Sequence, residues 1–401
     1  MFIHRLTAFE VPVALRSEVR HASHTRTENS TLLVRCVMND GSVGWGEGLP
    51  RAYVTGETIE TAWQHLTRTN FARFREQHFC SATELASSID RFPLHPIESV
   101  HENPPRECFG NSARCALELA VLDAACRCEG ISIGELIHSL PESRGLAISR
   151  DNVFYSGVIT SLSPRRQFIS ALKMRLFAFR QVKIKVGTPD ISDRDCVARI
   201  RRIVGPRVDL RLDANEAWNC DDVTNRLAPL IPFGPSSIEQ PVAHRDVSGL
   251  AQVRKELSIP IMLDESLCCE QDAFRAIEGG WCDAFNIRLS KCGGLVRSIR
   301  LAAIAQSAGL SFQLGCQVGE TGILSAAGRH FACNLSGLQF LEGSYDRFLV
   351  RDRLTTQDVT FLYRGRGPRI TGPGLGVDVD ECRIRELAVR QTDLIAPPNI
   401  R

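Results

Sequence analysis

Charged side chains follow most of the apolar, strand-like segments in the second half of this chain. The segment QVKIKVG, residues 181–187, alternates apolar residues with Lys183 and Lys185, which would share one face of a β-strand. Three carboxylates end later apolar segments in the same way: Asp213, Glu239 and Asp264. Amines beside grouped carboxylates could move a proton, and the carboxylates could hold a hard metal ion. A solvated edge strand is the simpler alternative for the two lysines.

The charged residues recur at nearly even intervals. The steps from Lys185 to Asp213, Glu239, Asp264, Lys291 and Glu320 are 28, 26, 25, 27 and 29 residues. Glu342 follows the next apolar segment, LQFL. If one β-α unit separates each pair, these groups lie at the same level of a barrel, at the carboxyl ends of its strands. A solvated stripe of charge would not recur once per unit.

The carboxylate trio predicts a metal site. Three anions from adjacent strands repel one another unless a cation neutralises them, and all-oxygen ligands suit Mg²⁺, with Mn²⁺ as the other candidate. Three separate salt bridges to arginines are the alternative.

The lysines on either side of the trio predict proton transfer. Lys185 precedes it by one strand and Lys291 follows it by one strand. An ammonium near other cations loses part of its preference for the charged form, so a lysine here can act as a base. We expect Lys185 to take the proton next to a substrate carboxylate, Lys291 to act from the other side, and Lys183 to tune Lys185 or touch the substrate.

These side chains need a scaffold that aligns the ends of many strands. Eight apolar segments alternate with amphipathic stretches from about residue 151, which favours a (β/α)8 barrel. A doubly wound open sheet is the alternative, but no GxGxxG follows its first strand. We predict an α+β domain over residues 1–130, a barrel over 131–350, and a C-terminal segment, 351–401, that returns to the first domain.

The composition is that of a globular protein. Hydrophobic residues make up 43%, charged residues 23%, and the net charge is +2, so neither nucleic acid nor a membrane is the expected partner. The start of the chain lacks the pattern of a signal peptide. Fifteen cysteines without a CxxC pair indicate reduced core thiols rather than a zinc or disulfide framework, and hence a cytoplasmic protein.

Several motifs, in order, resemble the enolase superfamily in its muconate lactonizing enzyme subgroup. They are KIK, LDAN, IEQP, LDES, SKCGG, ETGI and GPGLGVDVD. The resemblance implies a modified TIM barrel under an N-terminal α+β capping domain that the C-terminal tail completes. It implies Mg²⁺ on Asp213, Glu239 and Asp264, with Lys185 and Lys291 as the acid/base pair. It also implies a small-molecule carboxylate substrate and, by analogy, a homo-oligomer.

Other residues are expected to support the site or touch substrate. Those near the strand ends are Asn215, Glu265, Glu320, Glu342 and Ser344. Members of the subgroup take specificity from capping-domain loops, here about residues 14–30 and 48–57; Arg16, His21 and His24 lie in the first. Glu320 could pair with a substrate ammonium, orient Lys291, or only bond to nearby backbone.

The core motifs favour enolate chemistry without fixing one reaction. The loop PRAYVTGET is similar to that of some dipeptide epimerases, but FLEGSYD replaces their Asp-x-Asp on the last strand and leans towards muconate cycloisomerases. We therefore expect an isomerase of the cycloisomerase type. The alternatives are a dipeptide epimerase, an N-succinylamino acid racemase or an o-succinylbenzoate synthase-like enzyme and, more remotely, a barrel without catalysis.

Overall fold

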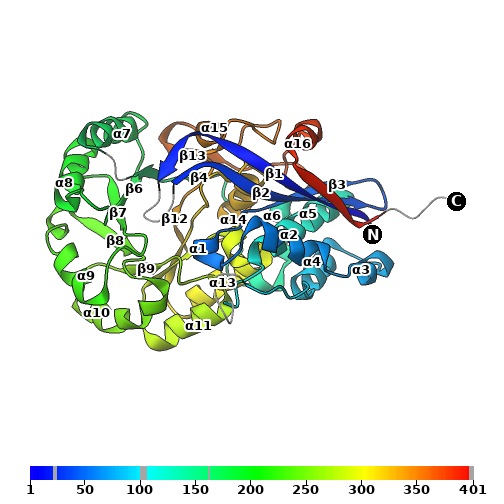
Figure 1. The fold of residues 1–401 in the computed structure, drawn as a ribbon, viewed down its shortest axis with the longest axis horizontal. Helices are drawn as coiled ribbons and strands as arrows, with labels where there is room; N and C mark the ends of the chain where they lie inside the picture. Colours follow the sequence, from blue (N-terminus) through cyan, green and yellow to red (C-terminus); the bar gives the residue numbers. More distant parts are fainter. Residues whose placement is uncertain (21–24, 100–105, 161–162, 397–401) are drawn as a thin grey trace.

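The computed structural model of the protein describes residues 1–20, 25–99, 106–160 and 163–396. A barrel occupies one end of the molecule and a sheet with its own helices occupies the other (Figure 1). Among the described residues, no helix is long and apolar enough to cross a membrane.

Eight parallel strands form the barrel, in the spatial order β12-β11-β10-β9-β8-β7-β6-β5. They are β5 (Gly157–Ile159), β6 (Gln181–Lys185), β7 (Asp209–Asp213), β8 (Pro235–Glu239), β9 (Ile261–Leu263), β10 (Ala284–Ile287), β11 (Ser311–Leu314) and β12 (Leu338–Leu341). The amide of Ser156 donates to the carbonyl of Leu341 at 2.7 Å, which brings the two ends of the sheet together. Each strand coincides with one of the eight predicted apolar segments, with β8 beginning one residue earlier, at Pro235.

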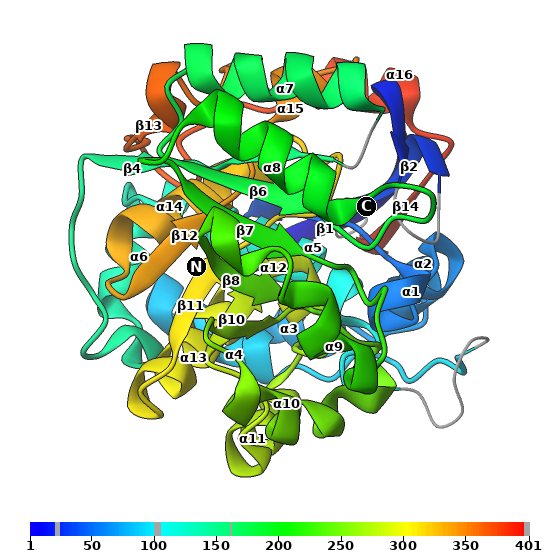
Figure 2. The same ribbon diagram turned by 90° about the vertical axis from the view of Figure 1, so that its left-hand side faces the viewer.

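In the described part of the chain, seven helices of two turns or more connect the strands, and Figure 2 shows helices around them. They are α7 (Pro164–Leu176), α8 (Asp193–Val204), α9 (Cys220–Leu227), α10 (Leu250–Glu256), α11 (Glu270–Gly279), α13 (Leu295–Ser307) and α14 (Gly322–Asn334). A one-turn helix, α12 (Leu289–Cys292), precedes α13, and among the described residues the first helix after the last strand is the short α15 (Asp346–Leu349). The barrel is thus the modified, seven-helix form, which confirms the predicted fold class.

The capping domain is built on an antiparallel sheet in the order β14-β1-β2-β3. Its strands are β1 (Ile3–Arg20), β2 (Thr25–Met38), β3 (Val43–Gly48) and β14 (Arg390–Ile395). Its helices are α1 (Ala52–Thr55), α2 (Ile59–Thr67), α3 (Ala72–Glu76), α4 (Ala82–Arg91), α5 (Asn111–Glu129) and α6 (Ile133–Ser139). Because β14 pairs with β1, the C-terminal tail completes this sheet.

The tail first crosses the barrel. Its strand β13 (Arg366–Pro368) pairs with β4 (Asn152–Phe154), which lies just before β5, and helix α16 (Glu381–Leu387) then packs near β1. The prediction of a tail that returns to the first domain is therefore confirmed as part of the fold.

Alternate glycines let α5 lie directly on β3. A Cβ at Gly44, Gly46 or Gly48 would stand 2.0–2.1 Å from backbone atoms of α5. The facing helix positions carry small residues four apart in the sequence: Ser112, Ala116, Ala120 and Ala124. Because glycine and alanine remove the spacing atoms, helix and strand approach closely, and this fixes the helix over the sheet.

Two buried carboxylates join the capping domain to the barrel. Glu47, on β3, accepts from the amides of Thr321 and Leu324 at the start of α14, at 2.9 and 3.0 Å. Glu118, on α5, accepts from the amides of Leu295 and Val296 at the start of α13. Helix N-termini offer unpaired N–H groups and favour negative charge, so each carboxylate caps a barrel helix.

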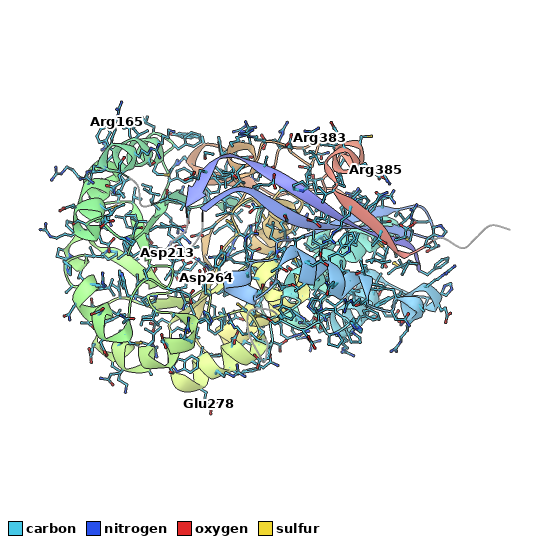
Figure 3. The ribbon with its side chains drawn as sticks, viewed as in Figure 1. Arg165, Asp213, Asp264, Glu278, Arg383 and Arg385 are labelled. Atoms are coloured by element: carbon cyan, nitrogen blue, oxygen red, sulfur yellow. The ribbon has the colours of Figure 1, made fainter. Side chains whose placement is uncertain are left out.

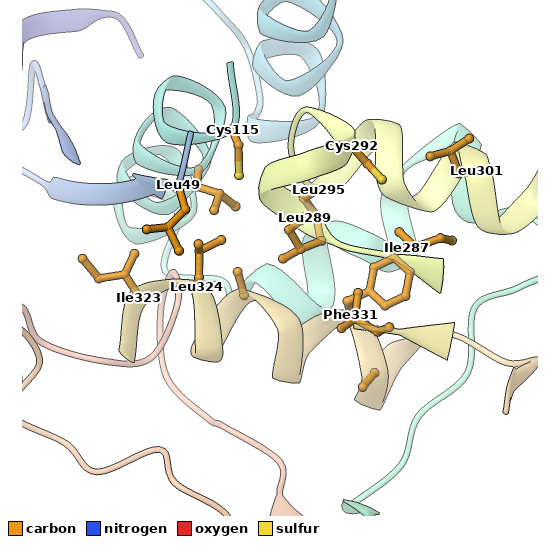
Figure 4. Packing of buried hydrophobic residues seen from close by; sticks show 14 of the residues in the cluster. Leu49, Cys115, Ile287, Leu289, Cys292, Leu295, Leu301, Ile323, Leu324 and Phe331 are labelled. Carbon is orange, nitrogen blue, oxygen red and sulfur yellow. The ribbon is translucent and has the colours of Figure 1, made fainter. Parts of the chain in front are cut away.

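Apolar packing continues across the same junction. Figure 4 shows Leu49 and Cys115 of the capping domain beside Leu289 and Leu324 of the barrel. All belong to one buried cluster that runs through both parts of the molecule. The capping domain is therefore held firmly over the carboxyl ends of the barrel strands.

Candidate active site

Three predicted residues lie in one row across neighbouring strands. Lys185 is in register with Asp213, and Asp213 is in register with Glu239. Asp264 follows β9 directly, and its side chain is fully buried, as are those of Asp213 and Glu239. Figure 3 shows Asp213 and Asp264 well inside the outline of the molecule, whereas Arg165 and Glu278 lie on its periphery.

Lys183 sits among carboxylates on the inner face of β6. Its Nζ lies 3.2 Å from Asp213 Oδ2, 3.2 Å from Glu239 Oε1 and 2.8 Å from Glu342 Oε2. Burial alone would lower the pKa of this ammonium, but the surrounding negative charges raise it well above its usual value. Lys183 is therefore a fixed positive charge, and the solvated-edge alternative does not apply to it.

A second cation, Arg211, lies in the barrel interior beside Lys183. Its guanidinium donates to Glu342 Oε1 at 3.0 Å, to Ser156 Oγ at 2.9 Å, and to the side chain of Gln313. Glu342 is thus held by two cations at once. Because both cations pair with Glu342, its carboxylate has little negative charge left to bind a positively charged ligand.

Lys185 differs from the other cations of the site. Among the described residues its Nζ has no hydrogen-bond or ion-pair partner, and the side chain is only partly buried. Burial lowers its pKa, and the charges of Lys183 and Arg288 act in the same direction against Asp213 and Glu265. An unpaired amine that is more easily neutral is the expected form of a general base.

Lys291 lies elsewhere than its spacing suggested. Strand β10 ends at Ile287, so Lys291 falls inside α12, one turn further on. Its side chain is fully buried and donates to Asp264 Oδ1 at 2.8 Å, to the Asp264 carbonyl at 2.7 Å and to the Asn286 carbonyl at 2.7 Å. An ammonium has three N–H donors, and all three are occupied.

The residue that directly follows β10 is Arg288. Its guanidinium contacts Asp264 Oδ2 and lies 3.8 Å from Glu239 Oε1, and its side chain is 12% exposed. Burial alone would raise the pKa of Asp264, but Arg288 and Lys291 hold that pKa well below its usual range. Asp264 is therefore an anion that two cations share.

The donor set fits a hard divalent ion in chemistry. Asp213, Glu239 and Asp264 offer carboxylate oxygens from three adjacent strands, and Asp213 Oδ2 is buried and accepts no well-aligned hydrogen bond, with the Lys183 ammonium 3.2 Å away. Lys183 and Arg288 keep these carboxylate oxygens apart. Within the described ranges, the one set of three or more histidine, thiol or carboxylate side chains whose ligand atoms all lie within 4.8 Å of one another is a different set: Glu107, Cys269 and Asp272. Metal binding therefore requires the trio to draw together and these cations to yield.

Backbone strain collects at the same strand ends. Of seven non-glycine residues with positive φ in the described chain, four follow barrel strands: Asn215, Glu216, Gln240 and Ser344. The amide of Asn215 donates to Asp213 Oδ1 at 3.1 Å, and Gln240 Oε1 accepts from the amide of Asp264 at 2.9 Å. Strained backbone that orients carboxylates is typical of functional sites.

The remaining predicted residues are placed as follows. Glu265 is buried, its Oε2 has no hydrogen-bond partner, and burial raises its pKa. Glu320 accepts from the amide of Gln317 at 2.7 Å, and burial raises its pKa to about 8. Of the three roles expected for Glu320, the contact seen is that with nearby backbone. Ser344 Oγ accepts from Arg329 at 3.1 Å.

The capping-domain loops lie against the barrel near Glu320. Arg51 donates to the carbonyl of Val318 at 2.9 Å and to Asn29 Oδ1 at 3.0 Å, and Asn29 donates to the same carbonyl. Arg16 is exposed on β1. His21 and His24 lie outside the described residues.

Four polar residues of the site were not predicted: Arg211, Arg288, Asn286 and Gln313. The signal for Arg211 was present, because it precedes Asp213 by two residues on one strand and so shares its face. The signal for Arg288 was its position directly after the strand AFNI. Asn286 and Gln313 donate to Glu239 at 2.7 and 3.2 Å from inside apolar strands, where nothing in the sequence marks them.

Comparison with known proteins shows the family of this chain. Two family models match: the enolase C-terminal domain-like model over residues 167–383, and the mandelate racemase / muconate lactonizing enzyme N-terminal domain over residues 3–138. The hydrophobic dipeptide epimerase of Enterococcus faecalis is 29% identical over 80% of this chain and 84% of its own length. A solved structure of a dipeptide epimerase from that organism, complexed with Mg and L-Leu-L-Tyr, has a TM-score of 0.81 at 25% identity, covering 94% of this chain and 100% of that chain.

Relatives of other activities are similar to the same extent. The N-succinyl-L-Arg/Lys racemase of Bacillus cereus is 25% identical over 98% of this chain and 99% of its own length. The muconate cycloisomerase 1-1 of Acinetobacter lwoffii is 28% identical over 88% of both chains. With family models over both halves, the chain belongs to the enolase superfamily of enzymes, among the proteins with mandelate racemase / muconate lactonizing enzyme domains.

Proposed function

We propose that this chain is a Mg²⁺-dependent enzyme that removes the proton next to the carboxylate of a small-molecule substrate. The observation that carries the proposal is the unpaired amine of Lys185 in register with Asp213 and Glu239. Asp213, Glu239 and Asp264 would hold the ion, with Mn²⁺ as a possible substitute. Bound Mg²⁺ would supply positive charge that favours the enolate.

The chain's own residues divide the remaining work. Lys185 takes the proton on its lone pair. Lys183 stays charged and lies on the inner face of β6 two residues before the base, where it lowers the pKa of Lys185. The closely packed capping domain excludes water above the strand ends, which strengthens every charge interaction below it.

Within this chemistry we favour an isomerase of the muconate cycloisomerase type. A substrate with a free ammonium group needs an unpaired carboxylate to bind it. Glu342, directly after the last strand, is already held by Lys183 at 2.8 Å and Arg211 at 3.0 Å, and Ser344 is held by Arg329. The end of the last strand therefore offers no unpaired carboxylate to a substrate ammonium, and this favours a diacid or an N-acylated substrate over a dipeptide.

A second candidate is an epimerase or racemase of dipeptides or N-succinylamino acids. The relatives with those activities support it, because they match this chain at 25–29% identity over most of its length. A lyase similar to o-succinylbenzoate synthase would use the same first step. A barrel without catalysis is disfavoured because the unpaired amine of Lys185 and three buried carboxylates are present together at the strand ends.

Deuterium incorporation tests the proposal. The protein would be incubated in D₂O with Mg²⁺ and pooled N-succinyl amino acids, dipeptides and muconate-like diacids, and products would be read by mass and NMR. Lactone formation supports the cycloisomerase, and deuterium next to a carboxylate supports the enolate step in general. No incorporation together with no Mg²⁺-dependent shift in melting temperature would favour the non-catalytic barrel.

A further inference from the structure

The outer face of helix α7 is apolar and open to solvent. Of its 13 residues, only Gln167 and Ala171 are buried. Four large apolar side chains are exposed by 37–67%: Phe168, Ile169, Leu172 and Leu176. At about 100° per residue these four positions fall within roughly one third of the helix circumference, so they form a single stripe. A contiguous apolar stripe that the fold leaves uncovered marks an interaction surface.

Positive charge flanks this stripe on both sides. By the same helical geometry, Arg166 and Lys173 lie along one side of the stripe and Arg175 along the other. Arg165, near the start of α7, points away from the molecule (Figure 3). Residues 152–189 contain no aspartate or glutamate, and none of these four cations has an ion-pair partner among the described residues. Their charges are therefore available to a partner.

A second stretch without acidic residues lies beside the end of α7. Residues 359–377 likewise contain no aspartate or glutamate. The amide of Arg364 donates to the carbonyl of Phe177 at 2.9 Å, and the ring centroids of Phe177 and Tyr363 lie 6.4 Å apart. A groove opens between the two stretches, and it is lined by Phe154, Arg180, Leu362, Tyr363, Arg364 and Arg366. We call the stripe, its flanking cations and this groove the basic apolar face.

The chemistry of the basic apolar face selects among partners. A second copy docked through the same stripe about a two-fold axis would bring the cations of both α7 helices together with no acidic residue on either helix, and like charges repel. The phosphates of a nucleic acid would pair with the arginines but would leave the aliphatic side chains uncovered. An anionic bilayer suits both halves of the face, because its headgroups attract the cations and its acyl chains cover the stripe.

We propose that the basic apolar face docks on an anionic lipid bilayer, with α7 lying in the plane of the membrane surface. Helix α7 lies at the upper edge of the molecule in two perpendicular views, where a flat surface can reach it (Figures 1 and 2). Phe168, Leu172 and Leu176 enter the apolar boundary, and the flanking cations stay among the headgroups. The net charge of +2 conceals this face, because acidic residues elsewhere offset it.

The inference is independent of the proposed function, because α7 contributes none of the residues of the candidate active site. Vesicle binding tests it with the intact protein. Vesicles of phosphatidylcholine, alone or with about one third phosphatidylserine, would be sedimented with the protein at low and at high salt. We expect at least about tenfold stronger binding to the anionic vesicles at low salt, and most of this binding should be lost at high salt. Equal binding to both kinds of vesicle, or binding to neither, would overturn the inference.

Paired substitutions separate the two halves of the face. Leu172→Gln with Leu176→Gln removes apolar contact at exposed positions and keeps good helix formers, so binding to anionic vesicles should fall at least about fivefold. Arg166→Gln with Lys173→Gln should lower it at least as much. Full binding by the leucine pair would show adsorption by charge alone and would overturn the assigned docking.

Matched controls and the state of association complete the test. Phe274→Gln, at an exposed apolar position on α11, and Arg73→Gln, on α3 of the capping domain, should bind vesicles like the wild type. Sedimentation velocity would compare the wild type with the leucine pair. Vesicle binding with the same state of association in both proteins supports the inference. A wild-type oligomer that the leucine pair dissociates, in a protein that binds no vesicles, would show that a second copy covers the stripe and would overturn it.

Discussion

At the scale of single residues, lysine is rare in this chain and concentrated in the site. Of 48 basic residues only five are lysines, and three of these, Lys183, Lys185 and Lys291, lie at or beneath the barrel mouth. Arginine can replace lysine wherever a charge is sufficient, but it cannot supply a lone pair. The one partly exposed, unpaired amine among the three is Lys185, which is why the chemistry is assigned to it.

Replacing Lys185 should therefore remove turnover and leave the fold intact. Lys185→Met keeps the length of the side chain without the amine, so α-proton exchange should fall by at least ~10²-fold, the usual contribution of a positioned base. The measurement is exchange in D₂O at saturating Mg²⁺, with Lys173→Met, on the exposed part of α7, as the control. Wild-type exchange in Lys185→Met would show that another group takes the proton.

A substitution of Asp213 tests the assignment of the metal ligands, and strand β7 also offers a matched control. Asp213→Asn should weaken Mg²⁺ binding, because it removes one negative charge and one of the two buried carboxylate oxygens that could bind the ion. The readout is the rise in unfolding free energy with Mg²⁺, which is about 2.7 kcal/mol at one hundred times the Kd. Asp209→Asn, at the other end of β7, should titrate like the wild type. Equal titration of both variants would mean that the ligands are misassigned.

At the scale of elements, buried carboxylates from the capping domain hold the starts of two barrel helices. Burial raises the pKa of Glu118 to about 7 despite two backbone donors. A carboxyl group whose pKa is higher in the folded protein binds its proton more tightly there than in the unfolded chain. The stability that Glu118 contributes is therefore present at pH values below its pKa in the unfolded chain, and it is lost as the pH rises through about 7.

The pH dependence of Glu118→Gln follows from that sign. The variant has no ionisable group at this position, so its free energy of unfolding should rise relative to that of the wild type between pH 5 and pH 8. Denaturant melts at unit steps of pH would measure the difference. Glu278→Gln, an exposed position on α11, is the control and should give a constant difference. A constant difference for Glu118→Gln as well would show that its pKa is not raised.

The strands and helices also show which features the sequence could and could not predict. The barrel strands were predictable because each is a short apolar segment, most of these segments end in or run into a charged residue, and the order of segments defines the order of strands. Lys291 was misplaced because even spacing along the chain was used where the end of β10 was decisive: Arg288 and the first two residues of α12 lie between β10 and Lys291. Lys183 and Arg211 pair with Glu342 from strands β6 and β7, whereas Glu342 follows β12. No local sequence pattern could therefore reveal these ion pairs.

At the scale of the whole molecule, the capping domain and the barrel share one apolar core. The buried cluster runs from β1 to β14 through both parts, and the sheet of the capping domain needs β14 from the far end of the chain. We expect the protein to be active only as this intact assembly, because the loops that cover the strand ends are anchored in a sheet whose edge strand is C-terminal.

Removal of residues 388–401 tests this dependence. The truncation deletes β14, exposes the edge of β1 and removes the ion pairs of Arg390 with Glu10 and Glu60. Because the capping domain and barrel are joined by apolar packing and by capped helices, we expect one calorimetric transition in both proteins, displaced to lower temperature in the truncated one. Agreement of calorimetric and van't Hoff enthalpies would verify a single unit. A truncated protein with two transitions, the upper one at the wild-type temperature, would show instead that the barrel folds without its cap and that the carboxylate contacts of Glu47 and Glu118 do not couple the two.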